Sequence, residues 1–552
     1  MDTLFIIIVA TLILLAICDL SVGVSNDAVN FMNSAIGSKA ARFRTIITVA
    51  SVGIFAGAAI SNGMMDIARH GIFTPTYFSF YDVLCLFVAV MITDVILLDV
   101  FNSLGLPTST TVSMVFELLG GAFAIAIIKI SNGLTDANGI PLDFGDLLNT
   151  EKALSVIIGI FLSVAIAFVL GSLIQWVARM VFSFTYKKRS TIRTIIFGAV
   201  AATAIIWFLL INGLKHSAFM TDDLKSLISQ NTWIILGVCL AFFSIVMSTL
   251  HFLKVNVLKI VVLMGTFSLA MAFAGNDLVN FIGVPLTGLE SLIDYTSHGN
   301  GNPSEFMMTS LNESAQTPLL YLILAGIIMV VSLIFSRKSR NVTKTEVGLS
   351  AHSEGDEMFG SSAAARVLVR MATNTSKTIT RFVPLNIRNW VNHRFVRNES
   401  DIESGAAYDL VRAAVNLVVA GLLVAFGTSH KLPLSTTYVT FMVAMGASLA
   451  DRAWSRESAV YRITGVLSVI GGWFITAGAA FTVCFLLTNA MYFGGYIAMG
   501  LLIAIGVVVV VMSNRQFSRK KNATPSDITF SKILQSYDKN EVWQLLGTHV
   551  RE

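Results

Sequence analysis

Asn26-Asp27-Ala28-Val29-Asn30-Phe31 and Asn276-Asp277-Leu278-Val279-Asn280-Phe281 are two copies of one motif, NDxVN. Leu106-Pro107-Thr108-Ser109-Thr110-Thr111 and Leu432-Pro433-Leu434-Ser435-Thr436-Thr437 are two copies of a second motif, LPxSTT. Both motifs interrupt long apolar stretches, where an ionisable side chain needs a partner or a functional role. Polar interruptions at matching places of two halves are the strongest sequence indication of a transporter's binding site.

The composition indicates a membrane protein. Of the 552 residues, 55% are hydrophobic and 13% are charged, whereas about a quarter of a soluble protein is charged. Stretches of roughly 17–25 apolar residues are long enough to cross a bilayer as helices, and we count about 11–13 such segments. We therefore predict an all-α polytopic protein in contact with the lipid bilayer. The net charge of +5 lies in short loops and indicates topology, not a nucleic-acid partner.

The basic loops predict the orientation of the chain. Clusters of Lys and Arg follow the first, fifth, ninth and last apolar segments. The positive-inside rule places these clusters in the cytoplasm, and the N-terminus outside, of a plasma (inner) membrane. The residues are Lys39, Arg42, Arg44, Arg179, Lys187, Lys188, Arg189, Arg193, Arg337, Lys338, Arg340, Arg515, Arg519, Lys520 and Lys521.

This orientation makes the two NDxVN copies point in opposite directions, because Asp27 ends an inward helix and Asp277 an outward one. Opposed copies are typical of an inverted-repeat transporter with broken helices and two helical hairpins. We divide the chain into a first repeat, a connecting or peripheral helix, a second repeat interrupted by a cytoplasmic loop, and a cytoplasmic tail. The first repeat is 1–215 and the connecting helix is 216–249. The second repeat is 250–336 and 406–512, the loop that interrupts it is 337–405, and the tail is 513–552.

The NDxVN motif supplies oxygen ligands. Gly23, Ser25 and Gly275 are expected to loosen the helices there, so that backbone carbonyls and side-chain oxygens point at a ligand. Oxygen ligands suit a hard cation such as sodium, while an asparagine amide can also donate to an anion. The alternative is that these side chains only fix helix packing through hydrogen bonds. This interpretation is the weaker one, because the motif occurs in two inverted copies.

The LPxSTT motif is suited to an anion. Proline favours the first turn of a helix and Ser or Thr favours its cap, so each copy predicts a helix start inside a hairpin. Free N–H groups, the positive end of the helix dipole and the hydroxyls would face the ligand. Two such ends across a pseudo-twofold axis suit a tetrahedral oxyanion. The alternative is that Ser and Thr only cap membrane helices.

These motifs resemble those of the inorganic phosphate transporter (PiT) family, and Ile36-Gly37-Ser38-Lys39-Ala40 also resembles its signature. The resemblance implies sodium/phosphate symport by movement of one helix bundle against another, with inorganic phosphate and sodium as partners and no other cofactor. It implies a sodium site at Asn26, Asp27, Asn276 and Asp277. It implies a phosphate site at Ser109, Thr110, Thr111, Ser435, Thr436, Thr437, Asn30 and Asn280.

Two further carboxylates lie in apolar segments near the first LPxSTT copy. Asp94 precedes it and Glu117 follows it, and either is a candidate third cation ligand or proton carrier. The oligomeric state is left open, a homodimer being one candidate.

Other functions remain as alternatives. Proton coupling, or sulfate or another oxyanion as substrate, would use the same motifs. An intramembrane aspartyl protease using Asp27 and Asp277 is a different class, but it would leave the duplicated Ser-Thr-Thr segments without a purpose. We therefore expect a secondary transporter and not an enzyme.

Overall fold

The computed structural model of the chain describes most of its residues. They are 2–61, 65–104, 108–135, 139–184, 191–212, 221–299, 301–313, 317–335, 339–350, 361–367, 369–371, 374, 383–396, 405–430, 432, 434–454 and 458–522. Contacts divide the chain into two compact units, Met1–Met499 and Gly500–Glu552. The first unit contains both copies of both motifs, and the second contains the end of helix α18.

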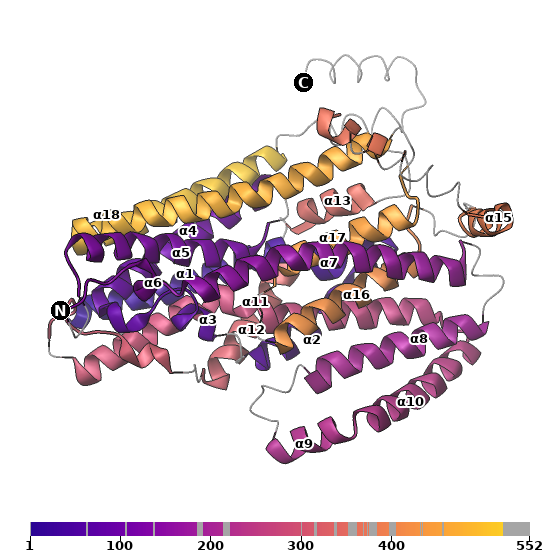
Figure 1. The fold of residues 1–552 in the computed structure, drawn as a ribbon, viewed down its shortest axis with the longest axis horizontal. Helices are drawn as coiled ribbons and strands as arrows, with labels where there is room; N and C mark the ends of the chain where they lie inside the picture. The colour runs from indigo at the N-terminus through magenta and orange to yellow at the C-terminus, as the bar shows by residue number, and fades with distance from the viewer. Residues whose placement is uncertain are drawn as a thin grey trace. The chain divides into compact units, whose positions relative to one another are not determined.

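Helices dominate the described residues, as Figure 1 shows. The longer ones are α1 (Asp2–Gly37), α2 (Phe43–Ala59), α4 (Phe80–Leu104), α5 (Thr110–Ser131), α7 (Thr150–Phe182), α8 (Thr191–Ile206), α10 (Thr232–Phe252), α11 (Val257–His298), α12 (Leu319–Phe335), α13 (Ser339–Ser350), α16 (Leu410–Ser429), α17 (Thr436–Ala450) and α18 (Ser458–Asn522). The shorter ones are α3 (Asp66–His70), η2 (Pro75–Tyr77), α6 (Phe144–Leu147), η4 (Trp207–Asn212), α9 (Asp222–Gln230), η6 (Thr309–Asn312) and α15 (Leu385–Arg394).

The all-α polytopic membrane fold is confirmed. Among the described residues, nine helices are long and apolar enough to cross a membrane, and three more are apolar but shorter. The last two predicted segments share α18, which bends at Gly495, where φ is 61° and ψ is −157°. A left-handed φ is strained for other residues and free for glycine. In the most apolar 18-residue stretch of α10 only 6% of the residues are buried, as expected for a helix facing lipid.

The helices break at one motif and not at the other. Both LPxSTT copies lie at breaks, between α4 and α5 and between α16 and α17. The expectation of loosened helices at NDxVN is wrong, because α1 and α11 run through their motifs without interruption. Gly23 instead permits close packing, since a Cβ there would lie 2.1 Å from the Phe281 ring. The carbonyl of Gly275 stays in the helix and also accepts a hydrogen bond from Ser61 at 3.1 Å.

Related contacts occur twice, once around α1 and once around α11. α1 packs on α4, α11 and α12, while α11 packs on α16, α1 and α2. Gly120 of α5 and Gly446 of α17 make matching approaches to a helix of the other half. A Cβ on Gly120 would lie 2.3 Å from the Phe481 carbonyl oxygen, and one on Gly446 would lie 2.3 Å from the Phe168 carbonyl oxygen. The two halves therefore interlock through their hairpins.

This packing predicts that Gly446→Ala destabilises the protein by about 1–3 kcal/mol, the usual cost of overpacking against backbone that cannot yield. Gly237→Ala in α10 is the matched control, because a Cβ there meets nothing within 4 Å and alanine is the better helix former. Thermal unfolding of the purified protein in detergent measures both. A melting temperature for Gly446→Ala equal to that of Gly237→Ala would contradict the close approach.

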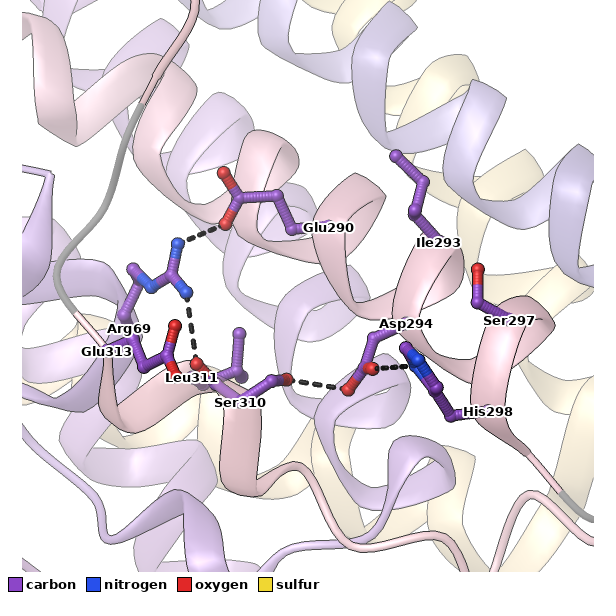
Figure 2. Close-up of a pocket in the computed structure, with 9 residues that line it drawn as sticks. All are labelled: Arg69, Glu290, Ile293, Asp294, Ser297, His298, Ser310, Leu311 and Glu313. Carbon is purple, nitrogen blue, oxygen red and sulfur yellow. Dashed lines mark hydrogen bonds and ion pairs between the residues drawn. The ribbon is translucent and has the colours of Figure 1, made fainter.

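The C-terminal part of α11, beyond its motif, is tied to α3 and η6 around a cavity of about 450 Å³ (Figure 2). Arg69 pairs there with Glu290 and donates to the Ser310 carbonyl at 3.3 Å. Ser310 Oγ donates to Asp294 at 2.6 Å, and His298 pairs with Asp294 at 2.9 Å. The residues that line this cavity include no predicted site residue, and their contacts serve to anchor the helix end.

Candidate functional site

The two hairpin breaks present capped helix starts. Ser109 is the N-cap of α5, and its Oγ accepts a hydrogen bond from the Val112 N–H at 3.1 Å. Ser435 is the N-cap of α17 and accepts from the Tyr438 N–H at 3.2 Å. The predicted capping role is confirmed, while Leu106, Pro107 and Pro433 lie outside the described residues. Each serine keeps its own O–H for donation. Each helix start places the positive end of its dipole at its LPxSTT motif.

Each aspartate of NDxVN is bound by hydroxyls from both hairpins. Asp27 accepts hydrogen bonds from Thr110 Oγ1 at 3.2 Å and from Thr437 Oγ1 at 2.9 Å. Asp277 accepts from Thr111 Oγ1 at 3.2 Å and from Thr436 Oγ1. The four motifs, which lie far apart in the sequence, therefore converge on one place. This is the arrangement that the duplicated motifs predict.

The second asparagine of each motif binds the hairpin of the opposite half. Asn30 Nδ2 donates to Thr437 Oγ1 at 3.0 Å and to Thr436 Oγ1 at 3.4 Å. Asn280 Nδ2 donates to Thr111 Oγ1 at 3.0 Å and to Thr110 Oγ1 at 3.2 Å. Each asparagine thus joins the two neighbouring threonines of one hairpin.

Together these contacts close a ring of eight side chains, which we call the polar ring. The ring runs Asn280, Thr110, Asp27, Thr437, Asn30, Thr436, Asp277 and Thr111. Its hydrogen bonds have fixed directions, because an amide N–H can only donate and an ionised carboxylate can only accept. Every threonine therefore accepts from an asparagine and donates to an aspartate. Thr111 Oγ1 also lies 3.4 Å from the Leu434 carbonyl oxygen, farther than the 3.2 Å to Asp277.

Thr440, which sequence reasoning missed, fixes the orientation of one ring member. Its Oγ1 donates to Asn30 Oδ1 at 3.2 Å, so that the Asn30 amide N–H groups face the ring. The helical spacing could have identified Thr440, because it lies one turn after Thr436 and so on the same face of α17.

Several buried polar atoms beside the polar ring have no hydrogen-bond partner within the described part of the chain. These are Oδ1 of Asn26, both polar atoms of the Asn276 side chain, and Oδ1 of Asn280. Buried polar atoms in folded proteins are almost always paired. Asn26 and Asn276 occupy the same position in the two motifs, directly before the aspartates. Free amide oxygens beside carboxylates are a donor set suited to a hard cation.

The whole site is closed to solvent in this conformation. Each of the twelve residues predicted for phosphate or sodium is at most 1% exposed. A ligand bound among these residues would be held inside the protein and would reach either side only after a conformational change.

The two further carboxylates lie together with a third that was not predicted. Glu117 accepts a hydrogen bond from Ser113 Oγ at 2.7 Å. Asp19 of α1 interacts electrostatically with both Asp94 and Glu117. All three are fully buried, at 0–1% exposure. Asp19 is an ionisable residue within an apolar segment, so the rule that identifies Asp94 also applies to it.

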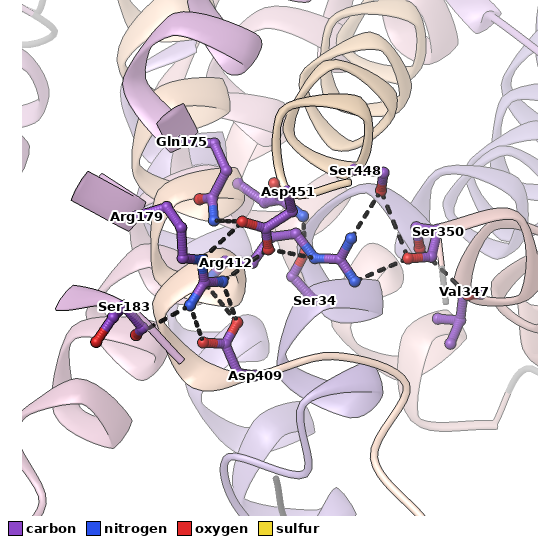
Figure 3. A network of polar contacts seen from close by, with 11 residues as sticks. Ser34, Gln175, Arg179, Ser183, Val347, Ser350, Asp409, Arg412, Ser448 and Asp451 are labelled. Atoms are coloured by element: carbon purple, nitrogen blue, oxygen red, sulfur yellow. Dashed lines mark hydrogen bonds and ion pairs between the residues drawn. The ribbon is translucent and has the colours of Figure 1, made fainter. Parts of the chain in front are cut away.

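A buried ion network holds the ends of α7, α16 and α17 together (Figure 3). Arg179 contacts Asp409 at 2.9 Å and Asp451 at 2.7 Å, and all three side chains are at most 1% exposed. Arg179 was expected in a basic loop but lies in the last turn of α7. Its guanidinium group has two carboxylate partners there, which allows it to be buried.

Comparisons with known proteins identify the family and a similar fold. A model of the phosphate transporter family matches residues 23–345. A solved structure described as "The sodium-dependent phosphate transporter" has a similar fold, with a TM-score of 0.56 and 16% sequence identity over 89% of this chain and 98% of that chain. No curated protein matches the sequence.

Proposed function

Because the chain belongs to the phosphate transporter family, we propose that it imports inorganic phosphate together with sodium by alternating access. The protein is a multi-pass membrane transporter and not an enzyme. The sodium coupling, the direction of transport and the assignment of residues to each ion are our proposal. A plasma-membrane location with the N-terminus outside remains a prediction from the sequence. The oligomeric state stays open, a homodimer being one candidate.

The polar ring is the observation that carries this proposal. We assign sodium to the carboxylates of Asp27 and Asp277 and to the unpartnered amide oxygens of Asn26 and Asn276. We assign phosphate to the hydroxyls at the two helix starts, with Asn30 and Asn280 as further amide donors. The phosphate-binding hydroxyls are those of Ser109, Thr110, Thr111, Ser435, Thr436 and Thr437.

The directions of the hydrogen bonds suggest how the two ions are coupled. In this conformation, the single proton of each ring threonine is donated to an aspartate. An anion would compete with these carboxylates for the same protons, and it would also be repelled by their charge. A sodium ion bound to the carboxylates neutralises that charge and occupies their lone pairs. The threonine hydroxyls can then turn to donate to phosphate.

Occlusion of the site supports alternating access. Since every predicted ligand is buried, both ions would enter from one side and leave on the other through different conformations. The interlocked halves offer two bodies that could move against each other, as in other inverted-repeat transporters.

Uptake into proteoliposomes tests the proposal. Labelled phosphate should accumulate with an inward sodium gradient and should fall to background when choline replaces sodium. Competition by unlabelled phosphate, arsenate and sulfate identifies the oxyanion, because sulfate offers no proton at neutral pH whereas the other two do. Equal uptake in sodium and choline would remove sodium coupling, and stronger competition by sulfate than by phosphate would remove phosphate as the substrate.

Proton coupling is the second candidate, and the buried carboxylates favour considering it. Asp19, Asp94 and Glu117 lie together in a medium of low dielectric, where like charges repel strongly. A bound proton or a third cation would relieve this repulsion. A collapse of phosphate uptake when the proton gradient is dissipated at constant sodium would support this candidate.

We predict that Glu117→Gln changes ion dependence more than maximal uptake. Loss of one charged ligand is expected to raise the sodium or proton concentration needed for half-maximal uptake by roughly tenfold or more, since hydrogen bonds to charged groups contribute about 1.5–3 kcal/mol. Glu305→Gln, in a solvent-exposed turn, is the control. Unchanged dependence on both cations would remove Glu117 from the cation pathway.

A further inference from the structure

The predicted cytoplasmic loop contains a helix with one buried face. In α13, Thr343, Glu346, Leu349 and Ser350 are 7%, 0%, 4% and 2% exposed. Their spacing of three to four residues places them on one side of the helix. Two of these four side chains carry hydroxyls and one is ionisable, which is unusual for a face that only fills an apolar contact. The segment 337–405 therefore does more than connect two membrane helices.

The buried face of α13 packs on α1 next to the polar ring. Asn33 Nδ2 donates a hydrogen bond to Glu346 Oε1. Asn33 follows Asn30 of the polar ring by three residues, which is an advance of about 4.5 Å along a helix. The Tyr408 hydroxyl holds the same turn of α1 by donating to the Asn33 carbonyl at 3.2 Å. The Glu346 carboxyl group thus lies one helical turn from the site, on the side that the predicted topology assigns to the cytoplasm.

The C-terminal end of α13 is bound to the second hairpin, as Figure 3 shows. The Ser350 carbonyl accepts a hydrogen bond from Arg412 Nη2 of α16 at 2.8 Å and from Ser448 Oγ of α17 at 3.4 Å. Arg412 also donates to Ser448 Oγ at 3.0 Å. One short helix therefore bridges α1, which carries the first motif, and the α16–α17 hairpin, which carries the last.

We infer that α13 closes the phosphate path toward the cytoplasm and that Glu346 is the side chain that seats it on α1. This inference rests on the proposed transport function and adds an element that belongs to neither repeat. During transport α13 must separate from α1, because it covers the turn that follows the polar ring.

The contact is built to be reversible. Glu346 Oε2 is buried and has no hydrogen-bond partner among the described residues, so leaving the contact would return it to water. Burial raises the pKa of Glu346 to about 8, so the carboxyl group is mostly protonated at neutral pH and is not buried as a full charge. An unpaired buried polar group costs free energy whether it is an oxygen or a protonated O–H, and this cost offsets part of what closure gains.

Labelling of a cysteine on the buried face of α13 tests the inference without phosphate. Ser350→Cys places a thiol on that face, at a position that is 2% exposed and whose hydroxyl donates within α13 to the Glu346 carbonyl, in a parent chain whose accessible Cys18 and Cys239 are replaced by serine. A membrane-impermeant thiol reagent is added to inside-out vesicles. Adding Glu346→Ala should increase the labelling rate at least tenfold. Glu346→Gln, whose side-chain oxygen can still accept from Asn33, should stay within twofold of the parent.

A Glu346→Ala variant labelled at the same rate as the parent would overturn the inference, as would acceleration seen only from the opposite side, in right-side-out vesicles. If Glu346→Ala does not fold, Glu346→Asp keeps the carboxyl group but shortens its reach, and the same acceleration is expected. The proposed function fails separately, by absence of sodium-driven phosphate uptake in the unmodified protein. Labelling that follows the expected pattern despite such a failure would leave α13 as the closure of a path for a different ion.

Discussion

Replacing Asp27 by asparagine is expected to lower sodium-driven phosphate uptake by about 100-fold or more. The substitution removes a buried charge that we assign to sodium, and it places N–H donors where Thr110 and Thr437 now donate. A loss of about 3 kcal/mol is reasonable for a charged ligand in a closed site, and each 1.4 kcal/mol corresponds to a factor of ten. Asp277→Asn should have a similar effect, because Asp277 has the equivalent two threonine partners.

The measurement is initial phosphate uptake in proteoliposomes at several sodium concentrations, with equal amounts of folded protein confirmed by gel filtration. Asp294→Asn is the matched control, because this aspartate lies on the same helix as Asp277 but pairs with His298 at the anchoring cavity. It should keep uptake within about twofold, as expected for a surface ion pair worth at most about 1 kcal/mol. Uptake by Asp27→Asn at the rate of the unmodified protein would remove this residue from the ion site.

Replacing Arg179 by methionine is expected to destabilise the protein by about 3–5 kcal/mol, enough to prevent recovery of folded protein. The substitution leaves Asp409 and Asp451 buried without their principal cation, and removal of one partner from a buried ion pair has a cost of this size. Arg179→Lys should rescue the protein only partly, since one ammonium group cannot match the two-carboxylate contact of a guanidinium group.

Thermal unfolding and the yield of monodisperse protein in detergent measure this effect. Arg452→Met is the control, because Arg452 directly follows Asp451 but is exposed; its loss should cost less than about 1 kcal/mol. Neutralising Asp409 as well, in the double variant Arg179→Met and Asp409→Asn, should recover much of the lost stability, because Asp451 keeps Arg412 as a buried cation 3.8 Å away. A double variant as unstable as Arg179→Met alone would show that packing, and not buried charge, determines the loss.

The sequence was sufficient to predict that the four motifs meet, because their polar residues stand out from the apolar segments around them. Asp27 and Thr110 belong to polar motifs in apolar surroundings, and duplication indicates which motifs belong together. Hydrophobicity also locates the membrane helices, since the bilayer fixes their length. The prediction of loosened helices at NDxVN failed because glycine has two uses, and Gly23 serves close packing against Phe281 and not flexibility.

Other features depend on contacts that no local pattern encodes. Arg179 is one of many arginines beside membrane segments, and its burial depends on Asp409 and Asp451, which lie 230 and 272 residues away. Glu346 belongs to a polar segment that is typical of a loop. Its burial follows from where α13 docks, and an isolated carboxylate in a polar stretch carries no periodic signal.

The crossed threonine contacts imply that neither half of this chain is a working unit. Asp27 depends on Thr437, and Asp277 depends on Thr111, so a fragment containing one repeat would have incomplete coordination at its own aspartate. A single-repeat ancestor with this chemistry would have needed to assemble as an antiparallel pair, inserted in the membrane in both directions. After fusion, a substitution at one of these positions must remain compatible with the residue that it contacts in the other half. The two halves are therefore expected to evolve together.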